Sequence, residues 1–119
     1  MATQYRQAIS RAFNAVANAL RVGHDVTGVA DNRRIVTTAG TRVTLVAATT
    51  PAKYVAITAE TDNTGLIVVG GATVVALLAT RQGIPLNAGD SMSMDVDDLV
   101  DVYLDSTVSG DGVTFTYET

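Results

Sequence analysis

Residues 83–104, GIPLNAGDSMSMDVDDLVDVYL, intersperse apolar side chains with aspartates. Over 91–96 the alternation of serine or aspartate with methionine or valine has a period of two, which predicts a half-buried strand. DVDDL then predicts a turn whose aspartates accept hydrogen bonds from exposed backbone N–H groups, and 101–106 predicts another strand with Asp101 and Asp105 on its polar side. We expect one core to receive the apolar side chains of this stretch, namely Ile84, Leu86, Met92, Met94, Val96, Leu99, Val102 and Leu104.

The same period extends outward from this stretch. Strand composition recurs in short segments separated by turn residues, at 42–48, 53–59, 66–70, 91–96, 101–106 and 113–118. Residues 71–82 are ambiguous between a strand and a helical turn. SGDG at 109–112 predicts a tight hairpin, with Gly110 and Gly112 available for positive φ. Turns about every ten residues predict a mainly β fold, an antiparallel β-sandwich or jelly-roll-like domain over 41–119.

The chain before this domain has a different pattern. Residues 3–22 predict one amphipathic α-helix, with Thr3 as its cap and Gly23 as its stop signal. Residues 23–40 are rich in turn residues and lack a period, so they predict a linker or an extended arm. The expected organisation is therefore a helix over 1–22, a linker or arm over 23–40 and a β-sandwich over 41–119.

The charges are unevenly divided. Residues 1–42 hold six Arg and two Asp, a net +4, and the remaining residues hold two basic and ten acidic side chains, a net −8; together they give the −4 of the chain. Such a split favours a basic part that contacts a partner and an acidic part that faces solvent. The basic part is sparse and poor in aromatic residues, which argues against nucleic acid as the partner. The chain has no cysteine, which excludes disulfides and Cys-ligated metals and favours a reducing place of synthesis.

No membrane anchor or secretory signal is expected. The apolar stretches are short and are interrupted by glycine or threonine, and the N-terminal helical pattern carries Arg6 and Arg11.

The acidic residues do not match a known catalytic or calcium motif. Counting from Asp95, an EF-hand would need an acid at Leu99, a glycine at Val100 and a glutamate at Ser106. A calcium site of another kind is the alternative, formed by Asp95, Asp97, Asp98 and Asp101 converging across a turn. A glycosidase pair of carboxylates has no support in these turn and strand contexts.

Other motifs for catalysis are missing as well. His24 is the single histidine and has no nucleophile motif to serve, and the glycines of 65–75 lack phosphate-loop spacing. We therefore expect a protein that is not an enzyme and holds no cofactor or metal.

The turns of the β domain form a recognisable series. Asn63-Thr64-Gly65 is followed by Val69-Gly70-Gly71, by 83–86 with Ala88-Gly89-Asp90-Ser91, by 96–99, by 102–105 and by 110–117. Over residues 53–118 this series resembles small β-sandwich proteins encoded in the structural gene clusters of tailed bacteriophages. These are virion accessory proteins: head decoration or cement proteins, head fibres and tail-associated components.

The resemblance implies a structural protein of the virion, made in the cytoplasm of the host bacterium. Its expected partners are the major capsid or other virion proteins and further copies of itself, a trimer being the guess. We expect the assembly interface in the basic part, at Tyr5, Arg6, Ile9, Arg11, Phe13, Val16, Leu20, Arg33 and Arg34. Two hypotheses follow: a capsid decoration protein that stabilises subunit junctions of the head, and a tail or fibre module that binds a host surface glycan.

Overall fold

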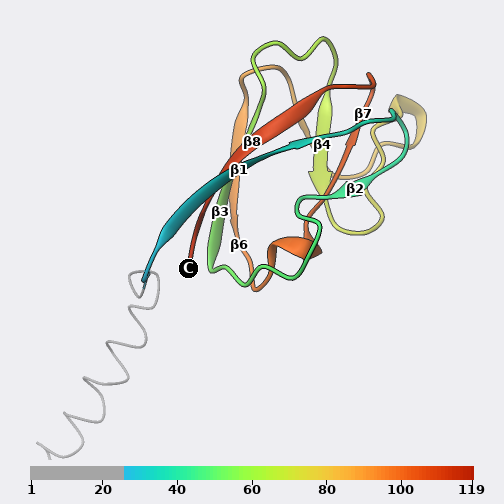
Figure 1. Cartoon of the computed structure of the whole chain (residues 1–119). Helices are drawn as coiled ribbons and strands as arrows, with labels where there is room; N and C mark the ends of the chain where they lie inside the picture. The colour runs from blue at the N-terminus through green and yellow to red at the C-terminus, as the bar shows by residue number, and fades with distance from the viewer. Residues whose placement is uncertain (1–25) are drawn as a thin grey trace, which may run out of the picture.

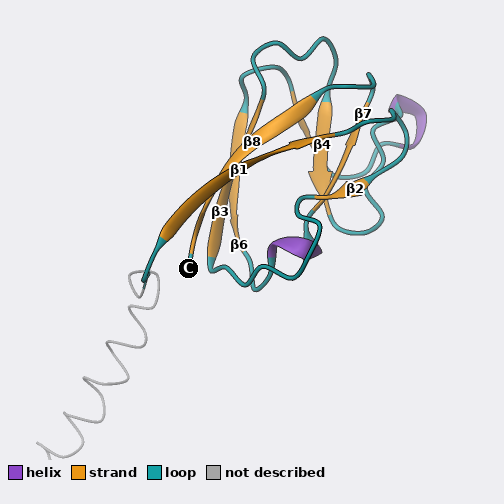
Figure 2. Cartoon of the chain, in the orientation of Figure 1, coloured by secondary structure: helices purple, strands orange, loops and turns teal. Residues whose placement is uncertain are grey.

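The computed structural model describes residues 26–119, which form strands joined by loops and by the short 3-10 turns η2 and η3. Figures 1 and 2 show the arrangement of these elements. The predicted helix over 3–22, the assembly residues on it and His24 lie outside the described residues. The elements in chain order are β1 (Val29–Ile35), β2 (Val43–Thr44), β3 (Tyr54–Ala59), β4 (Ile67–Gly70), η2 (Leu78–Thr80), β5 (Ile84–Leu86), β6 (Ser91–Asp95), η3 (Leu99–Asp101), β7 (Tyr103–Ser106) and β8 (Gly112–Glu118).

The strands form two antiparallel four-stranded sheets. One has the order β1-β8-β3-β6 and the other the order β2-β7-β4-β5. Four of the pairs join strands whose numbers add to nine: β1 with β8, β2 with β7, β3 with β6 and β4 with β5. The last four strands of the chain therefore pair, in reverse order, with the first four. The pairs β3–β8 and β4–β7 then join these couples side by side within each sheet.

A single apolar cluster draws side chains from both sheets. β3 alternates half-buried and buried residues, so that Val55, Ile57 and Ala59 enter the core. Ile67 and Val69 of β4 and Leu104 of β7 join them from the other sheet. Each such aliphatic side chain contributes about 1.5–3 kcal/mol when fully buried, so this cluster is the main source of stability.

The opening stretch supplies this core largely as predicted. Leu86, Leu99, Val102 and Leu104 are buried, and Met92, Met94 and Val96 pack half-buried against them. Ile84 is the exception, because it is 46% exposed on the edge strand β5.

A second, smaller cluster lies on the other side of β4. Val68 packs there with Val74 and Ala76 of the β4–β5 connection, and Tyr103 lies against them. This connection folds back over the sheet, which explains why Ile67, Val68 and Val69 are all buried. The ambiguous segment 71–82 is therefore a folded loop that contains η2 and one isolated bridge between Val75 and Gln82.

The prediction of a linker or arm over 23–40 is wrong for residues 29–35. These residues form β1, which pairs with β8 along its whole length. The sequence VADNRRI shows no alternation because β1 is an edge strand in which the three consecutive residues 31–33 are all exposed and polar. Its place in the sheet depends on β8, more than 75 residues away in the chain, and no local pattern reports that pairing.

Two turn predictions are also wrong. Residues 84–86, read as part of a turn, form the short strand β5, whose Pro85 is tolerated because β5 lies at a sheet edge. SGDG is not a hairpin, because β7 and β8 belong to different sheets and this segment crosses between them. Gly110 has the expected positive φ of 92°, whereas Gly112 does not.

The strands predicted over 53–59, 66–70, 91–96 and 113–118 are confirmed within one or two residues at their ends, and that over 101–106 begins with the turn η3. The strand predicted over 42–48 is reduced to Val43–Thr44. Within residues 26–119, no helix is long and apolar enough to cross a bilayer.

Candidate functional site

Two aspartates, Asp105 and Asp111, are buried and tie loops together. Asp105 on β7 is 2% exposed, and its Oδ1 accepts the N–H groups of Gly40 (3.0 Å) and Ser106 (2.8 Å). Its Oδ2 accepts the N–H of Ala76 at 2.8 Å. The prediction that Asp105 lies on the solvent side of its strand is wrong. Three backbone donors compensate the burial of its charge, which would otherwise be costly.

Asp111 performs the same role at another place. It is 6% exposed and accepts the N–H groups of Thr64 at 3.2 Å and Gly65 at 2.8 Å. It therefore links the β7–β8 connection to the β3–β4 connection. Neither carboxylate has the free, cleft-facing geometry of a catalytic acid or base.

Asp98 holds the turn before β7, as the sequence predicts. Its Oδ1 accepts the N–H groups of Val100 at 3.0 Å and Thr50 at 2.8 Å, so it caps η3 and also holds the β2–β3 connection. Leu99 beside it is fully buried. The Asp98 Oδ1 therefore holds the backbone of this turn in place.

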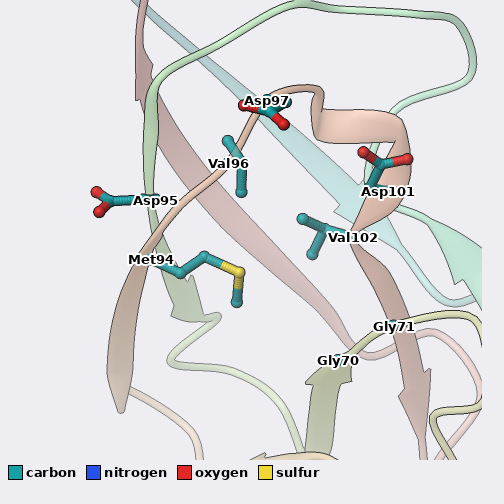
Figure 3. Close-up of a pocket in the computed structure, with 8 residues that line it drawn as sticks. All are labelled: Gly70, Gly71, Met94, Asp95, Val96, Asp97, Asp101 and Val102. Atoms are coloured by element: carbon teal, nitrogen blue, oxygen red, sulfur yellow. The ribbon is translucent and has the colours of Figure 1, made fainter.

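An open cleft of about 510 Å³ lies beside this turn (Figure 3). The side chains of Met94, Val96 and Val102 gather in it, and Gly70 and Gly71 line its far side. Asp97 and Asp101 stand at the rim, and Asp95 points away from both of them. The cleft is thus apolar inside and acidic at the rim.

The structure does not bring the aspartates of the proposed calcium site together. Asp95, Asp97 and Asp101 diverge around the cleft, and Asp98 is committed to backbone donors. Among residues 26–119, no three His, Cys, Asp or Glu side chains are close enough together to hold a metal ion.

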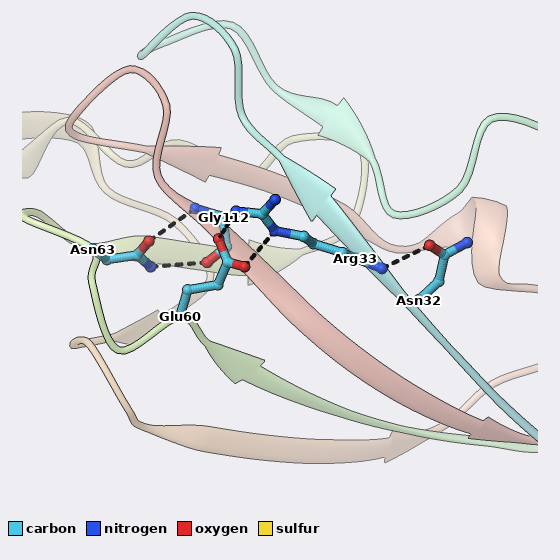
Figure 4. Close-up of polar contacts among 5 residues, drawn as sticks. All are labelled: Asn32, Arg33, Glu60, Asn63 and Gly112. Carbon is cyan, nitrogen blue, oxygen red and sulfur yellow. Dashed lines mark hydrogen bonds and ion pairs between the residues drawn. The ribbon is translucent and has the colours of Figure 1, made fainter.

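Of the predicted assembly residues, Arg33 and Arg34 lie in the described part, side by side on β1. Arg33 reaches over β8, where its Nε and Nη2 donate to the Glu60 carboxylate, the latter at 3.1 Å (Figure 4). This hydrogen bond and then the negative charge of Glu60 raise the pKa of Arg33 above its ordinary value. Arg33 therefore helps to fasten the edge strand to the end of β3.

Arg34 differs from its neighbour. It is half-buried, and its Nε is covered and has no acceptor among residues 26–119. A covered N–H without a partner costs about 1–3 kcal/mol.

Two of the turn motifs that carry the resemblance meet in space. Asn63 accepts the N–H of Gly112 at 3.0 Å and donates to its carbonyl at 2.8 Å, and Glu60 N–H donates to the same carbonyl (Figure 4). A side chain at Gly112 would collide with Ile35 and with the backbone of Arg34, so only glycine fits. The sequence shows Asn63-Thr64-Gly65 and Gly110-Asp111-Gly112 as turns, and nothing in it indicates that they bind one another.

Comparison with known proteins adds no relative: no protein-family model, curated protein or solved structure matches the chain.

Proposed function

We propose that this chain is a structural protein of a bacteriophage virion, a capsid decoration (cement) protein without catalytic activity. It binds the head surface at junctions between capsid subunits through residues 1–40 and leaves its acidic domain in solvent. Support comes from the resemblance over residues 53–118 and from the strand order.

The observation that carries the proposal is the pairing in which strand numbers add to nine. In an eight-stranded jelly-roll sandwich, the last four strands pair in reverse order with the first four, and the pairs alternate between two sheets that face one core. The strand order here has this arrangement. Jelly rolls recur in viral capsid domains, lectins and cupins. Of these three, the first agrees with the resemblance.

The loop contacts support a scaffold. Asp98 and Asp105 each accept backbone N–H groups from two different segments, and Asp111 accepts two N–H groups from the β3–β4 connection. Their carboxylates thereby hold the loops at both ends of the domain in fixed positions. A protein that cements a shell needs such rigidity, since the free energy of ordering its loops is then not lost on binding.

Arg34 suggests how the basic part would contribute. Its covered Nε lacks an acceptor among residues 26–119, and a carboxylate of a neighbouring capsid subunit would supply one. The contacts assigned to Arg6, Arg11 and the apolar stripe of residues 3–22 remain predictions from the sequence.

A glycan-binding module is the competing hypothesis. Such sites usually present exposed aromatic rings, whereas Tyr54, Tyr103 and Tyr117 are half-buried here and Phe115 is buried. We therefore retain glycan binding only as an outcome of the test below.

The test measures the copy number of the protein on purified particles of the phage that encodes it. The variant with Ile9→Asp and Phe13→Asp places charge on the predicted apolar stripe, and we expect it to be missing from heads that incorporate the wild type. A matched control carries Thr61→Asp and Thr73→Asp, at exposed positions of the β domain, and should be incorporated normally. Circular dichroism should show the same β signal for all three proteins.

Two results would contradict the proposal. One is an unchanged copy number for the Ile9 and Phe13 variant. The other is a wild-type chain that is missing from purified heads but binds host cell-wall polysaccharide in a saturable manner.

A further inference from the structure

The outer edge of β1 is the longest strand edge that the described domain presents. β1 spans Val29–Ile35 and pairs with β8 on one side only. The other edge strands are shorter: Ser91–Asp95 for β6, Ile84–Leu86 with its Pro85 for β5, and Val43–Thr44 for β2. A long strand edge with free backbone groups is a template for pairing with another strand.

The register fixes which backbone groups of β1 point outward. Thr119 N–H donates to Gly28 carbonyl and Val36 N–H donates to Asp111 carbonyl, so the even-numbered residues of β1 are bonded to β8. The N–H and C=O groups of the odd-numbered residues therefore point to the outer edge. These residues are Val29, Asp31, Arg33 and Ile35.

We infer that this edge pairs with the same edge of a second copy of the chain, antiparallel and about a two-fold axis at Asn32. In this register Val29 lies opposite the partner's Ile35, and Asp31 lies opposite the partner's Arg33. Every outward-pointing residue then meets another outward-pointing residue, as a continuous antiparallel ladder requires. The two four-stranded sheets containing β1 become one eight-stranded sheet.

The side chains make this register self-complementary. Asp31 and Arg33 are both exposed and on the same face of β1, so the contact contains two opposite-charge pairs related by symmetry. Glu60 occupies two N–H groups of Arg33 and leaves the others of its five for a carboxylate of the partner. Val29, which is 67% exposed, gains an apolar neighbour in the partner's Ile35.

The neighbouring registers are disfavoured. A shift of two residues in one direction places Asp31 opposite the partner's Asp31, and a shift in the other places Arg33 opposite the partner's Arg33. Like charges directly opposite each other destabilise a strand pair. The edge of β6 offers no comparable match, because centring it on Ser93 places Asp95 opposite a serine.

One local contact must give way. Asn32 Oδ1 accepts the N–H of Arg33 at 2.8 Å, and this N–H must be released to bond the second copy. A rotation of the exposed Asn32 side chain suffices, and a backbone carbonyl of the partner then replaces the amide oxygen as acceptor.

The experiment uses the full chain with Asp31→Arg, with Arg33→Asp, and a mixture of the two variants. Each variant alone puts two like-charge pairs in the contact, whereas a mixed pair restores two opposite-charge pairs. We expect the wild type to have an even multiple of the 12.4 kDa chain mass by sedimentation equilibrium. Each single variant should have half the wild-type mass, its association weakened about tenfold or more, and the equimolar mixture should recover it.

Asp95→Arg is the matched control, since it reverses an exposed aspartate on the opposite edge strand of the same sheet and should leave the mass unchanged. Amide exchange gives a second measurement. The outward amides of Val29, Asp31 and Ile35 should become protected as the wild-type concentration rises, and those of Ala30 and Asn32 should not change.

A wild type that remains at 12.4 kDa, single variants that keep the wild-type mass, or a mixture that does not reassociate overturns the inference. If Asp31→Arg abolishes incorporation into heads while the wild type is monomeric, the edge binds a capsid strand and not a second copy. The inference does not rest on the proposed function, because self-association is measured in solution and incorporation is measured on particles.

Discussion

Replacing Asp105 by Asn tests whether its buried carboxylate organises the loops of the domain. The substitution keeps the size of the side chain but removes the charge and one acceptor. An asparagine can turn its oxygen toward Gly40 and Ser106, and its NH₂ group then faces the N–H of Ala76. Ala76 is fully buried, so water cannot replace the lost acceptor.

The magnitude follows from these three bonds. An unsatisfied buried N–H costs about 1–3 kcal/mol, and the two remaining hydrogen bonds each lose about 1 kcal/mol when their acceptor is no longer charged. Part of this loss of stability is offset, because the neutral asparagine does not carry the desolvation penalty of a buried carboxylate. We expect a net loss of about 2–4 kcal/mol, which is a large part of the 5–15 kcal/mol typical of a domain.

Urea unfolding measured by circular dichroism gives the change directly, and thermal unfolding should show a midpoint lower by about 10–20 °C. Asp101→Asn is the control, because Asp101 is exposed at the rim of the cleft and should change stability by less than about 0.5 kcal/mol. The amide of Ala76 should exchange faster in the Asp105→Asn protein. A loss for Asp105→Asn no larger than that for Asp101→Asn would refute the assigned role.

Two further substitutions have defined outcomes. Gly83→Ala should lower the free energy of unfolding in urea by about 2–4 kcal/mol. Gly83 has φ of +116°, and a Cβ there would lie 2.8 Å from the Val69 carbonyl oxygen. Gly71→Ala is the control and should be close to neutral, because the space around Gly71 is open. Glu60→Gln should lower the unfolding midpoint slightly, and the difference should shrink in about 1 M salt, where screening is strong. The pKa of Arg33 is raised by Glu60, so the contribution of its charge is complete at and below the ordinary pKa of an arginine and is lost only at higher pH. A change in this contribution near neutral pH that arises from titration of Arg33 alone would contradict the assignment.

Much of the fold is predictable because a half-buried strand has a local signature. The alternation in SMSMDV and KYVAITA specifies which side chains enter the core, and the structure places Met92, Met94, Val55 and Ile57 there. The turn at Asp98 is also local, since its carboxylate caps a backbone N–H only two residues away. These features depend on neighbours in the chain, and the sequence alone contains them.

The remaining features depend on partners far away in the chain. VADNRRI becomes β1 only because β8 offers an edge, and Asp105 is buried only because loops from two other parts of the chain bring N–H groups to it. Both segments carry polar residues whose local pattern indicates solvent. The sequence by itself therefore determined the strands β3, β4, β6 and β8, most of the core side chains and the turn at Asp98. Only the tertiary structure decided which polar residues face solvent and which hold the fold together, because a hydrogen bond between distant segments has no local periodicity.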